Sequence, residues 1–282
     1  MSADKISWRF PAVAALAALA AASAWPAAAA AQSPWVERPA EPAITLEAIK
    51  ARPDGGGLTF PSSAWFLSGS VPVAEAATFV VELPLAYGAL DGGRFGGGES
   101  DFSIGDPYLG AILGAPGSDL TGELGVRVPL ASEDNLGSAV GILSDPVDRM
   151  EAFLPKVVSF SGTLNYGHTT PEGFAVGLRL GPRVWLRTES DFQDTAELFA
   201  VYGLQAGYRG ERGRLMVGLD GRAIITESDL SLGERTLHEL AVGGALRLGR
   251  VEPGLVVRLP LDQDLSELID YGVELQMTMP LR

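Results

Sequence analysis

The sequence predicts an all-β protein, an antiparallel up-and-down transmembrane β-barrel of about twelve strands. The first observation is a pattern repeated between Asp119 and Arg282, in which apolar side chains occupy every second position of successive runs. The second is that the positions between them carry Glu, Asp, Arg, Gln, Ser, Thr or Gly. Successive strand side chains point to opposite faces, so each run has an uncharged face for lipid and a charged face for a lumen.

The third observation is an N-terminal export signal, which we predict to span residues 1–31. Lys5 and Arg9 precede a run of small and apolar residues from Pro11 to Ala24, and the alanines at 29–31 supply a cleavage site. The alternative is an uncleaved helical anchor, but so short and alanine-rich a segment spans a bilayer poorly. Residues 32–57 are predicted to be a periplasmic arm that includes a first strand, and residues 58–282 to be the barrel.

Period-two runs between turn residues define the strands. They are predicted at 63–73, 77–88, 103–114, 119–130, 157–167, 174–187, 196–208, 214–226, 237–248, 252–261 and 268–281. Bacterial single-chain barrels have an even number of strands, so a further strand is required. We place it through Ile44, Leu46 and Ala48, which would leave both termini in the periplasm. Ten or fourteen strands are the alternatives.

Short and long connections alternate along the chain. Pro, Gly and Ser mark short turns near residues 75, 116, 171, 211 and 250. The long connections are 89–100, 132–155, 188–195, 227–236 and 262–267, and acidic residues crowd them. Outer-membrane barrels have short turns on the periplasmic side and long loops outside. The loop 132–155 is predicted to be a constriction or lid.

Two features favour a membrane over water. The uncharged face of the strands from residue 119 onward lacks Asp, Glu, Lys and Arg, and aromatic residues lie near strand ends at Tyr87, Tyr166, Phe174, Tyr208 and Tyr271. A soluble β-sandwich is the alternative, but its polar face would favour lysine. After residue 31, the only lysines in the sequence are Lys50 and Lys156.

Composition excludes several classes of protein. The chain has 35 acidic and 21 basic residues, so it has no general reason to seek nucleic acid. It contains no cysteine, which excludes disulfides, thiolate metal sites and a lipid-modified N-terminal cysteine. We expect a monomer in the bacterial outer membrane, in contact with its lipid.

The charged face is predicted to line the lumen. Its residues are Glu82, Glu123, Arg127, Arg179, Arg183, Arg187, Asp220, Arg222, Glu239, Arg247, Arg258, Asp270 and Glu274. One interpretation is a structural network in which these charges pair across adjacent strands. The other is a pore whose charges select solutes. Arg179, Arg183 and Arg187 form a basic ladder on one strand, which would guide anions unless neighbouring strands neutralise it.

The sequence gives no support for an enzyme. The only histidines are His168, predicted to lie at a turn with a capping or surface role, and His238, predicted to stand alone at a strand start. The glycines at 92–98 follow no α/β pattern and indicate a flexible loop. The aspartates between 134 and 148 match no calcium loop and are interpreted as solvated. We therefore expect neither a cofactor nor a metal.

A Val-x-Val/Leu-Pro-Leu motif recurs at 81–85, 126–130 and 257–261, with a Met-Thr-Met-Pro-Leu variant at 277–281. Proline lacks an amide donor, so these prolines should lie at strand ends or bulges. The segment 103–111, Ser-Ile-Gly-Asp-Pro-Tyr-Leu-Gly-Ala, followed by the strand ending Val128-Pro129-Leu130, resembles the outer-membrane barrel family named after the meta-pathway of phenol degradation. That family tends to have Pro-Thr-Gly where this chain has Pro129-Leu130-Ala131.

The resemblance implies passive uptake of small molecules, including hydrophobic or aromatic ones. Together with the charged face, it predicts passive or facilitated passage of small hydrophobic, aromatic or anionic solutes. The alternative is a non-conducting barrel with a structural role, or one whose acidic loops recognise a partner outside. The chain ends in Leu281-Arg282 rather than in the aromatic residue common in outer-membrane barrels.

Overall fold

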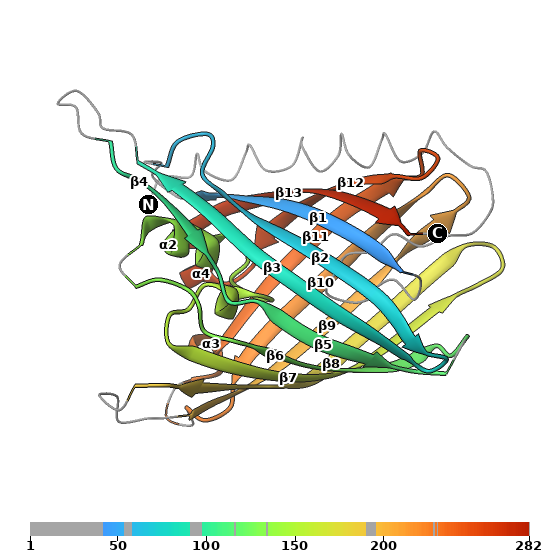
Figure 1. Ribbon diagram of the computed structural model, residues 1–282, viewed down its shortest axis with the longest axis horizontal. Helices are drawn as coiled ribbons and strands as arrows, with labels where there is room; N and C mark the ends of the chain where they lie inside the picture. The colour runs from blue at the N-terminus through green and yellow to red at the C-terminus, as the bar shows by residue number, and fades with distance from the viewer. Residues whose placement is uncertain are drawn as a thin grey trace.

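The protein is a closed antiparallel β-barrel of twelve strands, as the sequence predicts (Figure 1). The computed structural model describes residues 42–53, 58–90, 98–115, 117–133, 135–189, 196–227, 229 and 231–281. The predicted signal peptide and most of the predicted arm lie outside these residues. The strand predicted through Ile44, Leu46 and Ala48 is β1, which pairs with β2 on one side and with the last strand, β13, on the other. This pairing closes the barrel.

Each strand pairs with its neighbours in the chain. The bounds are β1 Ala43–Pro53, β2 Ser63–Ala74, β3 Ala77–Ala89, β4 Ser100–Ile104, β5 Tyr108–Leu113, β6 Leu120–Arg127, β7 Val157–Thr169, β8 Phe174–Arg187, β9 Ala196–Gly210, β10 Gly213–Ile224, β11 Thr236–Leu246, β12 Glu252–Pro260 and β13 Ile269–Pro280. The helices are α2 Leu136–Ser144, α3 Leu232–Arg235 and α4 Gln263–Leu268, with the 3₁₀ turn η3 Met150–Ala152.

One predicted strand, 103–114, is interrupted. β4 and β5 both pair with β3, and Gly105, Asp106 and Pro107 separate them, so the two segments together count as one wall strand. Pro84 of β3 lies opposite the interruption and its carbonyl accepts from the Gly105 amide at 2.9 Å. The strand predicted at 119–130 ends at Arg127, because Pro129 cannot donate to a ladder and the Asp106 carboxylate accepts from the amides of Leu130 and Ala131 instead.

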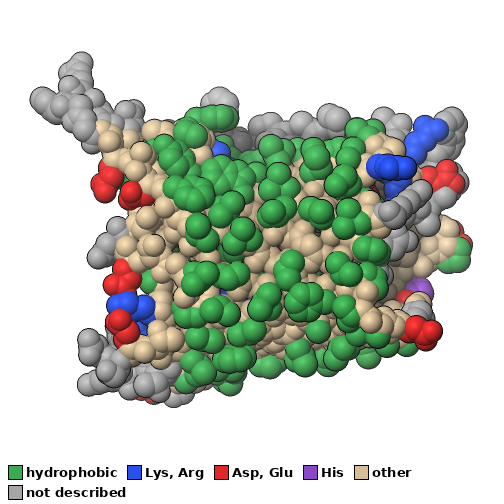
Figure 2. All heavy atoms as spheres, in the orientation of Figure 1, with side chains coloured by type: hydrophobic (Ala, Val, Ile, Leu, Met, Phe, Trp, Pro, Cys, Tyr) green, Lys and Arg blue, Asp and Glu red, His purple; other side chains and the backbone are tan. Residues whose placement is uncertain are grey.

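The outer surface of the wall is apolar. Leucines at outward positions, such as Leu124, Leu164, Leu180 and Leu275, are 60–61% exposed. Figure 2 shows hydrophobic side chains across the middle of this face and charged side chains at its two ends. The predicted aromatic residues lie on this outer side near strand ends, where the rings of Phe174 and Tyr208 meet edge to face at 5.9 Å. A surface of this kind needs lipid around it.

The two ends of the barrel differ. The long-loop end carries α2, α3 and α4, and the short-turn end carries the tight connections and the C-terminus (Figure 1). At the short-turn end the Leu281 amide donates to the carbonyl of Pro42 at 2.6 Å, so both ends of the described chain lie there. In the part of the chain that the structure describes, no helix has the length and apolarity to cross a membrane.

Candidate functional site

The loop between β6 and β7 enters the barrel, and we call its residues 132–155 the plug. Its helix, α2, begins at Asn135, whose side chain accepts from the Ser138 amide at 3.2 Å. The small residues Gly137 and Ser138 are buried against the wall strands β3 and β4, and Gly141 is buried against the Phe153 ring within the plug, which lets the helix approach closely. The chain then turns at Asp145 and continues through η3 to β7.

Three apolar clusters hold the plug against the wall. The largest is built around Phe153, which is fully buried and packs edge to face on Phe66 of β2 at 5.9 Å. In the second, Val147 packs with Ala51, Leu265 and Ile269. In the third, Met150 and Leu154 pack against residues that include Trp185 and Phe199. These contacts lie on both sides of the plug's charged residues and fix its position.

The interruption between β4 and β5 is a docking point for the plug. The Asp106 amide donates to the carbonyl of Ala152 at 2.6 Å. At Gly105 a Cβ atom would lie 2.3 Å from that same carbonyl oxygen, so any larger residue would push the plug away. The Gly-Asp-Pro sequence therefore breaks a wall strand where the plug needs access to its backbone.

Arg149 of the plug binds the acidic side of the wall. Its guanidinium donates to Glu47 of β1 at 2.7 Å and to Glu82 of β3 at 3.2 Å, and to Asp145 within the plug at 2.7 Å. It also lies 3.8 Å from the centre of the Phe66 ring. All four charged groups are buried.

Asp148 and Glu151 of the plug bind the basic side of the wall. Asp148 Oδ1 accepts from Arg179 of β8 at 2.8 Å. Glu151 bridges two strands, with one oxygen 2.7 Å from Arg183 of β8 and the other 2.7 Å from Arg222 of β10. The carbonyl of Asp148 also accepts from the guanidinium groups of Arg183 and Arg222.

The plug therefore spans the lumen. Its ion pairs reach β1 and β3 on one side and β6, β8, β10 and β12 around the rest of the wall, where Arg127 lies 3.9 Å from Glu151 and Arg258 lies 3.6 Å from Asp145. Acidic wall residues meet the plug's arginine, and basic wall residues meet its carboxylates. This match fixes both the depth and the rotation of the plug.

The surrounding charges keep the plug ionised. Burial alone would raise the pKa of Asp148, but the nearby guanidinium groups, led by Arg179 and Arg183, lower that pKa below its ordinary value. Burial would also raise the pKa of Glu151, but the guanidinium groups of Arg183 and Arg222 outweigh it and lower that pKa. Although burial opposes its charge, Arg149 has a raised pKa because Glu47 and Asp145 lie beside it.

The predicted lumen residues mostly face the interior and are paired. Glu82 accepts from Arg127 at 2.6 Å, and Glu123 accepts from the Tyr108 hydroxyl at 2.6 Å. Arg258 joins Glu239 at 2.9 Å and Glu274 at 2.6 Å. Asp220 is buried, with its Oδ2 lacking a partner among the described residues, and Arg247 is half-buried toward the short-turn end.

Asp270 is half-buried at an irregularity near the start of β13, so its place in the lumen stays a prediction. The pairing of β1 with β13 shifts register between Arg52 and Pro53. As a result Ile269 turns inward and is buried, while the Asp270 carboxylate lies 3.7 Å from Arg52, whose side chain is 64% exposed. Period-two alternation is interrupted here because Asp270 is the extra residue without a partner on β1, which moves Ile269 to the inner face.

The basic ladder is neutralised mainly by the plug. Arg179 and Arg183 pair with Asp148 and Glu151, whereas Arg187 lies 2.5 Å from Glu197 of the neighbouring strand β9. The interpretation of the loop aspartates as solvated is wrong for Asp145 and Asp148, which are buried in these pairs. Sequence reasoning also missed Glu47 and Arg149, although Glu47 lies on the inward face of the predicted first strand.

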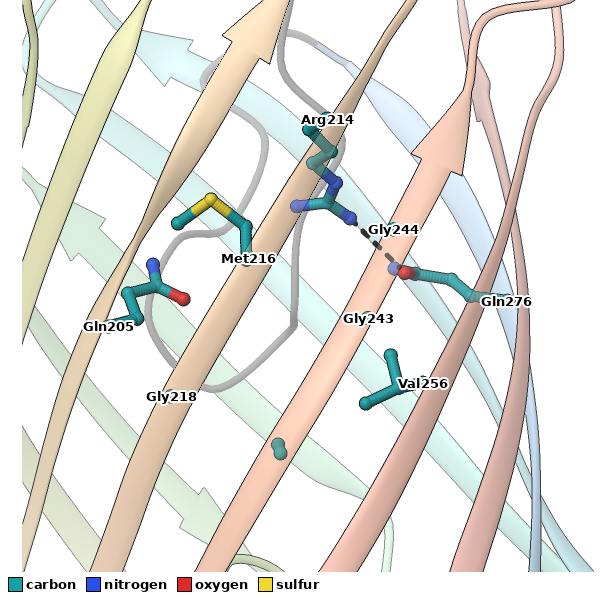
Figure 3. A pocket seen from close by; sticks show the side chains of 9 residues that line it. Gln205, Arg214, Met216, Gly218, Gly243, Gly244, Val256 and Gln276 are labelled. Atoms are coloured by element: carbon teal, nitrogen blue, oxygen red, sulfur yellow. Dashed lines mark hydrogen bonds between the residues drawn. The ribbon is translucent and has the colours of Figure 1, made fainter. Parts of the chain in front are cut away.

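Below the plug the lumen is lined differently. A small hollow is lined by Gln205, Arg214, Met216, Gly218, Ala241, Gly243, Gly244, Val256 and Gln276. In Figure 3 the side chains of Gln205 and Met216 lie on neighbouring strands beside this hollow, and Arg214 donates to Gln276 at 3.3 Å. Small and uncharged residues dominate this region.

The histidines lie outside the lumen. His168 is exposed and its Nδ1 lies 2.8 Å from Asp119, in keeping with the predicted surface role. His238 does not stand alone as predicted, because its ring lies between Tyr202 at 2.7 Å and Asp262 at 2.9 Å. Among the described residues no group of His, Asp and Glu has the arrangement of a metal site.

Neither a protein-family model nor a curated protein matches the sequence. Solved structures do match its fold. An outer-membrane channel from Pseudomonas putida F1 aligns with a TM-score of 0.59 and 12% identity over 90% of this chain and 100% of that one. The translocator domain of the autotransporter NalP from Neisseria meningitidis aligns with a TM-score of 0.54 and 10% identity over 86% of this chain and 89% of that one. The fold is that of a bacterial outer-membrane barrel.

Proposed function

We propose that this protein is an outer-membrane channel for small solutes, and that the plug is its gate. The observation that carries the proposal is that the plug crosses the lumen through ion pairs to opposite sides of the wall. The apolar outer surface and the similarity in fold to an outer-membrane channel support the membrane setting. The wall residues of the predicted pore would then bind either the plug or a passing solute.

Buried ion pairs suit a gate better than a permanent filling. Taking charges out of water costs about as much as their pairing returns, so such a network fixes a position more than it adds stability. Water or solute entering the lumen can replace these partners, whereas a dry apolar core offers no such exchange. The hollow below the plug gives a solute space to leave toward the short-turn end.

A reversible tether on the plug tests the proposal. Ser103 of β4 and Ser138 of α2 have their hydroxyl oxygens 2.7 Å apart, and the chain has no cysteine of its own. The double variant Ser103→Cys, Ser138→Cys can therefore join the plug to the wall through one disulfide. The matched control is Thr45→Cys, Thr278→Cys, whose hydroxyls are 3.1 Å apart on adjacent wall strands.

Single-channel currents are recorded in planar bilayers before and after a reductant. We expect reduction to raise the conductance of the plug-tethered protein at least severalfold and to leave the control unchanged. Equal conductance in both redox states would contradict a moving gate. If folded wild-type protein, both double variants and a variant lacking residues 132–155 were all silent, the non-conducting structural or surface-recognition barrel would be the correct function.

A further inference from the structure

A second cavity lies where the plug meets the basic side of the wall. It is bounded by β5 to β8 and by the plug. Arg127, Arg179 and Arg183 line it from the wall, and Asp148 and Glu151 line it from the plug. The free space there is close to that of a single water molecule, so a larger ligand must take space that the plug now occupies.

The wall of this cavity offers hydroxyl groups as well as guanidinium groups. Ser159, Ser161 and Thr163 lie at successive inward positions of β7, and the Tyr108 hydroxyl approaches from β5. β7 lies between β6, which carries Arg127, and β8, which carries Arg179 and Arg183. A column of hydroxyls flanked by arginines suits a polar ligand that carries both an anionic group and hydroxyls.

Buried donors remain to be satisfied at this site. Arg183, which lines the cavity, is 4% exposed, yet its Nε has no acceptor among the described residues. Arg222, which binds Glu151 from outside the cavity lining, is 2% exposed, and its Nε and Nη1 also lack an acceptor there, although its guanidinium lies 5.4 Å from the rings of Trp185 and Phe199. A buried N–H without a partner is costly. Two carboxylates of the plug thus leave this arginine cluster with donor capacity for a further oxyanion.

We propose that this cavity binds small hydroxylated organic acids, whose carboxylate takes the place of the Asp148 carboxylate on Arg179 and Arg183 while their hydroxyls meet the column on β7. Asp148 is then a tethered competitor for the solute. This assignment deepens the proposed function, since it names the solute that would displace the gate.

Charge balance explains why the solute must be an anion. The groups that face the cavity are the positive Arg127, Arg149, Arg179 and Arg183 and the negative Glu123, Asp148 and Glu151. A monovalent carboxylate that replaces Asp148 leaves this balance unchanged. A neutral solute would strand buried guanidinium groups without a counter-charge, which is strongly unfavourable.

Binding of gluconate and of sorbitol to the mature, detergent-folded barrel tests the proposal by calorimetry. The two probes share a six-carbon polyol chain and differ at the carboxylate. We expect gluconate to bind and sorbitol not to bind. Asp148→Asn should bind gluconate about tenfold more tightly or better, because removing the internal competitor frees at least one charge-assisted contact. Arg179→Gln should lose most of the binding.

The matched control is Glu197→Gln. It removes the charge of the carboxylate that pairs with Arg187, the third arginine of the ladder, which lies outside the cavity lining. It should leave gluconate affinity unchanged. Equal binding of sorbitol, tighter binding of inorganic phosphate than of gluconate, or unchanged affinity in a folded Asp148→Asn barrel would each overturn the proposal. Correct folding is checked by heat-modifiable migration of the barrel.

The assay also separates this inference from the proposed function. Gluconate binding to a barrel that never conducts would contradict the channel function and support the carboxylate-binding site. Conductance without gluconate binding would contradict the carboxylate-binding site and support the channel function.

Discussion

The interior of this barrel has two halves that are built by the same strands but filled in different ways. Toward the long-loop end, inward positions carry Glu, Asp and Arg, and the plug brings four more charged side chains to meet them. Toward the short-turn end, the hollow is lined mostly by Gly, Ala, Val, Gln and Met, with Arg214 as the charged residue of its lining, and Glu252 is buried at the same end. Charge is therefore concentrated where a second segment of the chain arrives to neutralise it.

This difference indicates where selectivity would reside. A half lined by small uncharged residues can pass a solute without recognising it. The half that contains the plug must break specific ion pairs before anything passes. Variants in the two halves should therefore have very different effects.

Replacing Arg149 with Ala should have the largest effect. It leaves Glu47, Glu82 and Asp145 without their shared buried partner, and breaking a buried pair in this way costs about 3–5 kcal/mol. Hydrogen exchange of the plug amides, including those of Ala152 and Phe153, should accelerate more than about hundredfold. The matched control Arg214→Ala, in the other half, should leave plug exchange unchanged. Similar acceleration in both variants would contradict the two-half description.

Replacing Phe153 with Ala should have the next largest effect. The ring is fully buried against Phe66, and a Phe→Ala change at such a site costs about 3 kcal/mol or more. Hydrogen exchange of the plug amides should accelerate, while the amides of the barrel strands keep their protection from exchange. Loss of protection in β1 and β13 as well would show that the plug supports the whole wall rather than docking on it.

Acidification should release the plug. The pKa values of Asp148 and Glu151 are lowered in the folded protein, so their contribution is fully present above the ordinary carboxylate pKa of about 4 and falls as the pH drops below it. Plug exchange, corrected for its intrinsic pH dependence, should rise below about pH 4. The variant Asp148→Asn, Glu151→Gln should lose much of this dependence. An equally steep profile there would assign the effect to other carboxylates.

Replacing Lys156 with Gln should have the smallest effect. Lys156 links Glu133 and Glu189 at the neck of the plug, but all three side chains are 38–48% exposed. Exposed ion pairs contribute about 0–1 kcal/mol, so plug exchange should change less than about fivefold. A change as large as that of Arg149→Ala would show that the neck, and not the buried network, holds the plug.

Much of the wall could be predicted from the sequence. Alternation alone placed Arg127, Arg183 and Glu274 on the inner face. A strand has only two faces, and the face in contact with lipid must be apolar, so charged side chains lie on the other one. The same rule is interrupted where backbone pairing is irregular, at Gly105–Pro107 and at Asp270. Bulges and interruptions depend on the neighbouring strand, which a single run of residues does not show.

The plug could not be predicted in the same way. Loop 132–155 has no period that marks an inner or outer face, so Asp145 and Asp148 read like the acidic residues of any exposed loop. Their burial depends on Arg179, Arg183 and Arg258, which lie far away in the chain. Only closure of the barrel brings these residues around one space.

The sequence by itself determined that this protein is a barrel, which face of its strands meets lipid, and that its inner face is charged, since each follows from side chains two positions apart. The tertiary structure decided that a plug satisfies many of these charges, in addition to the pairs between wall strands. The reason is physical: a closed wall of fixed circumference leaves a space that its own side chains do not fill, and ion pairs across that space form only between residues that folding has already brought together.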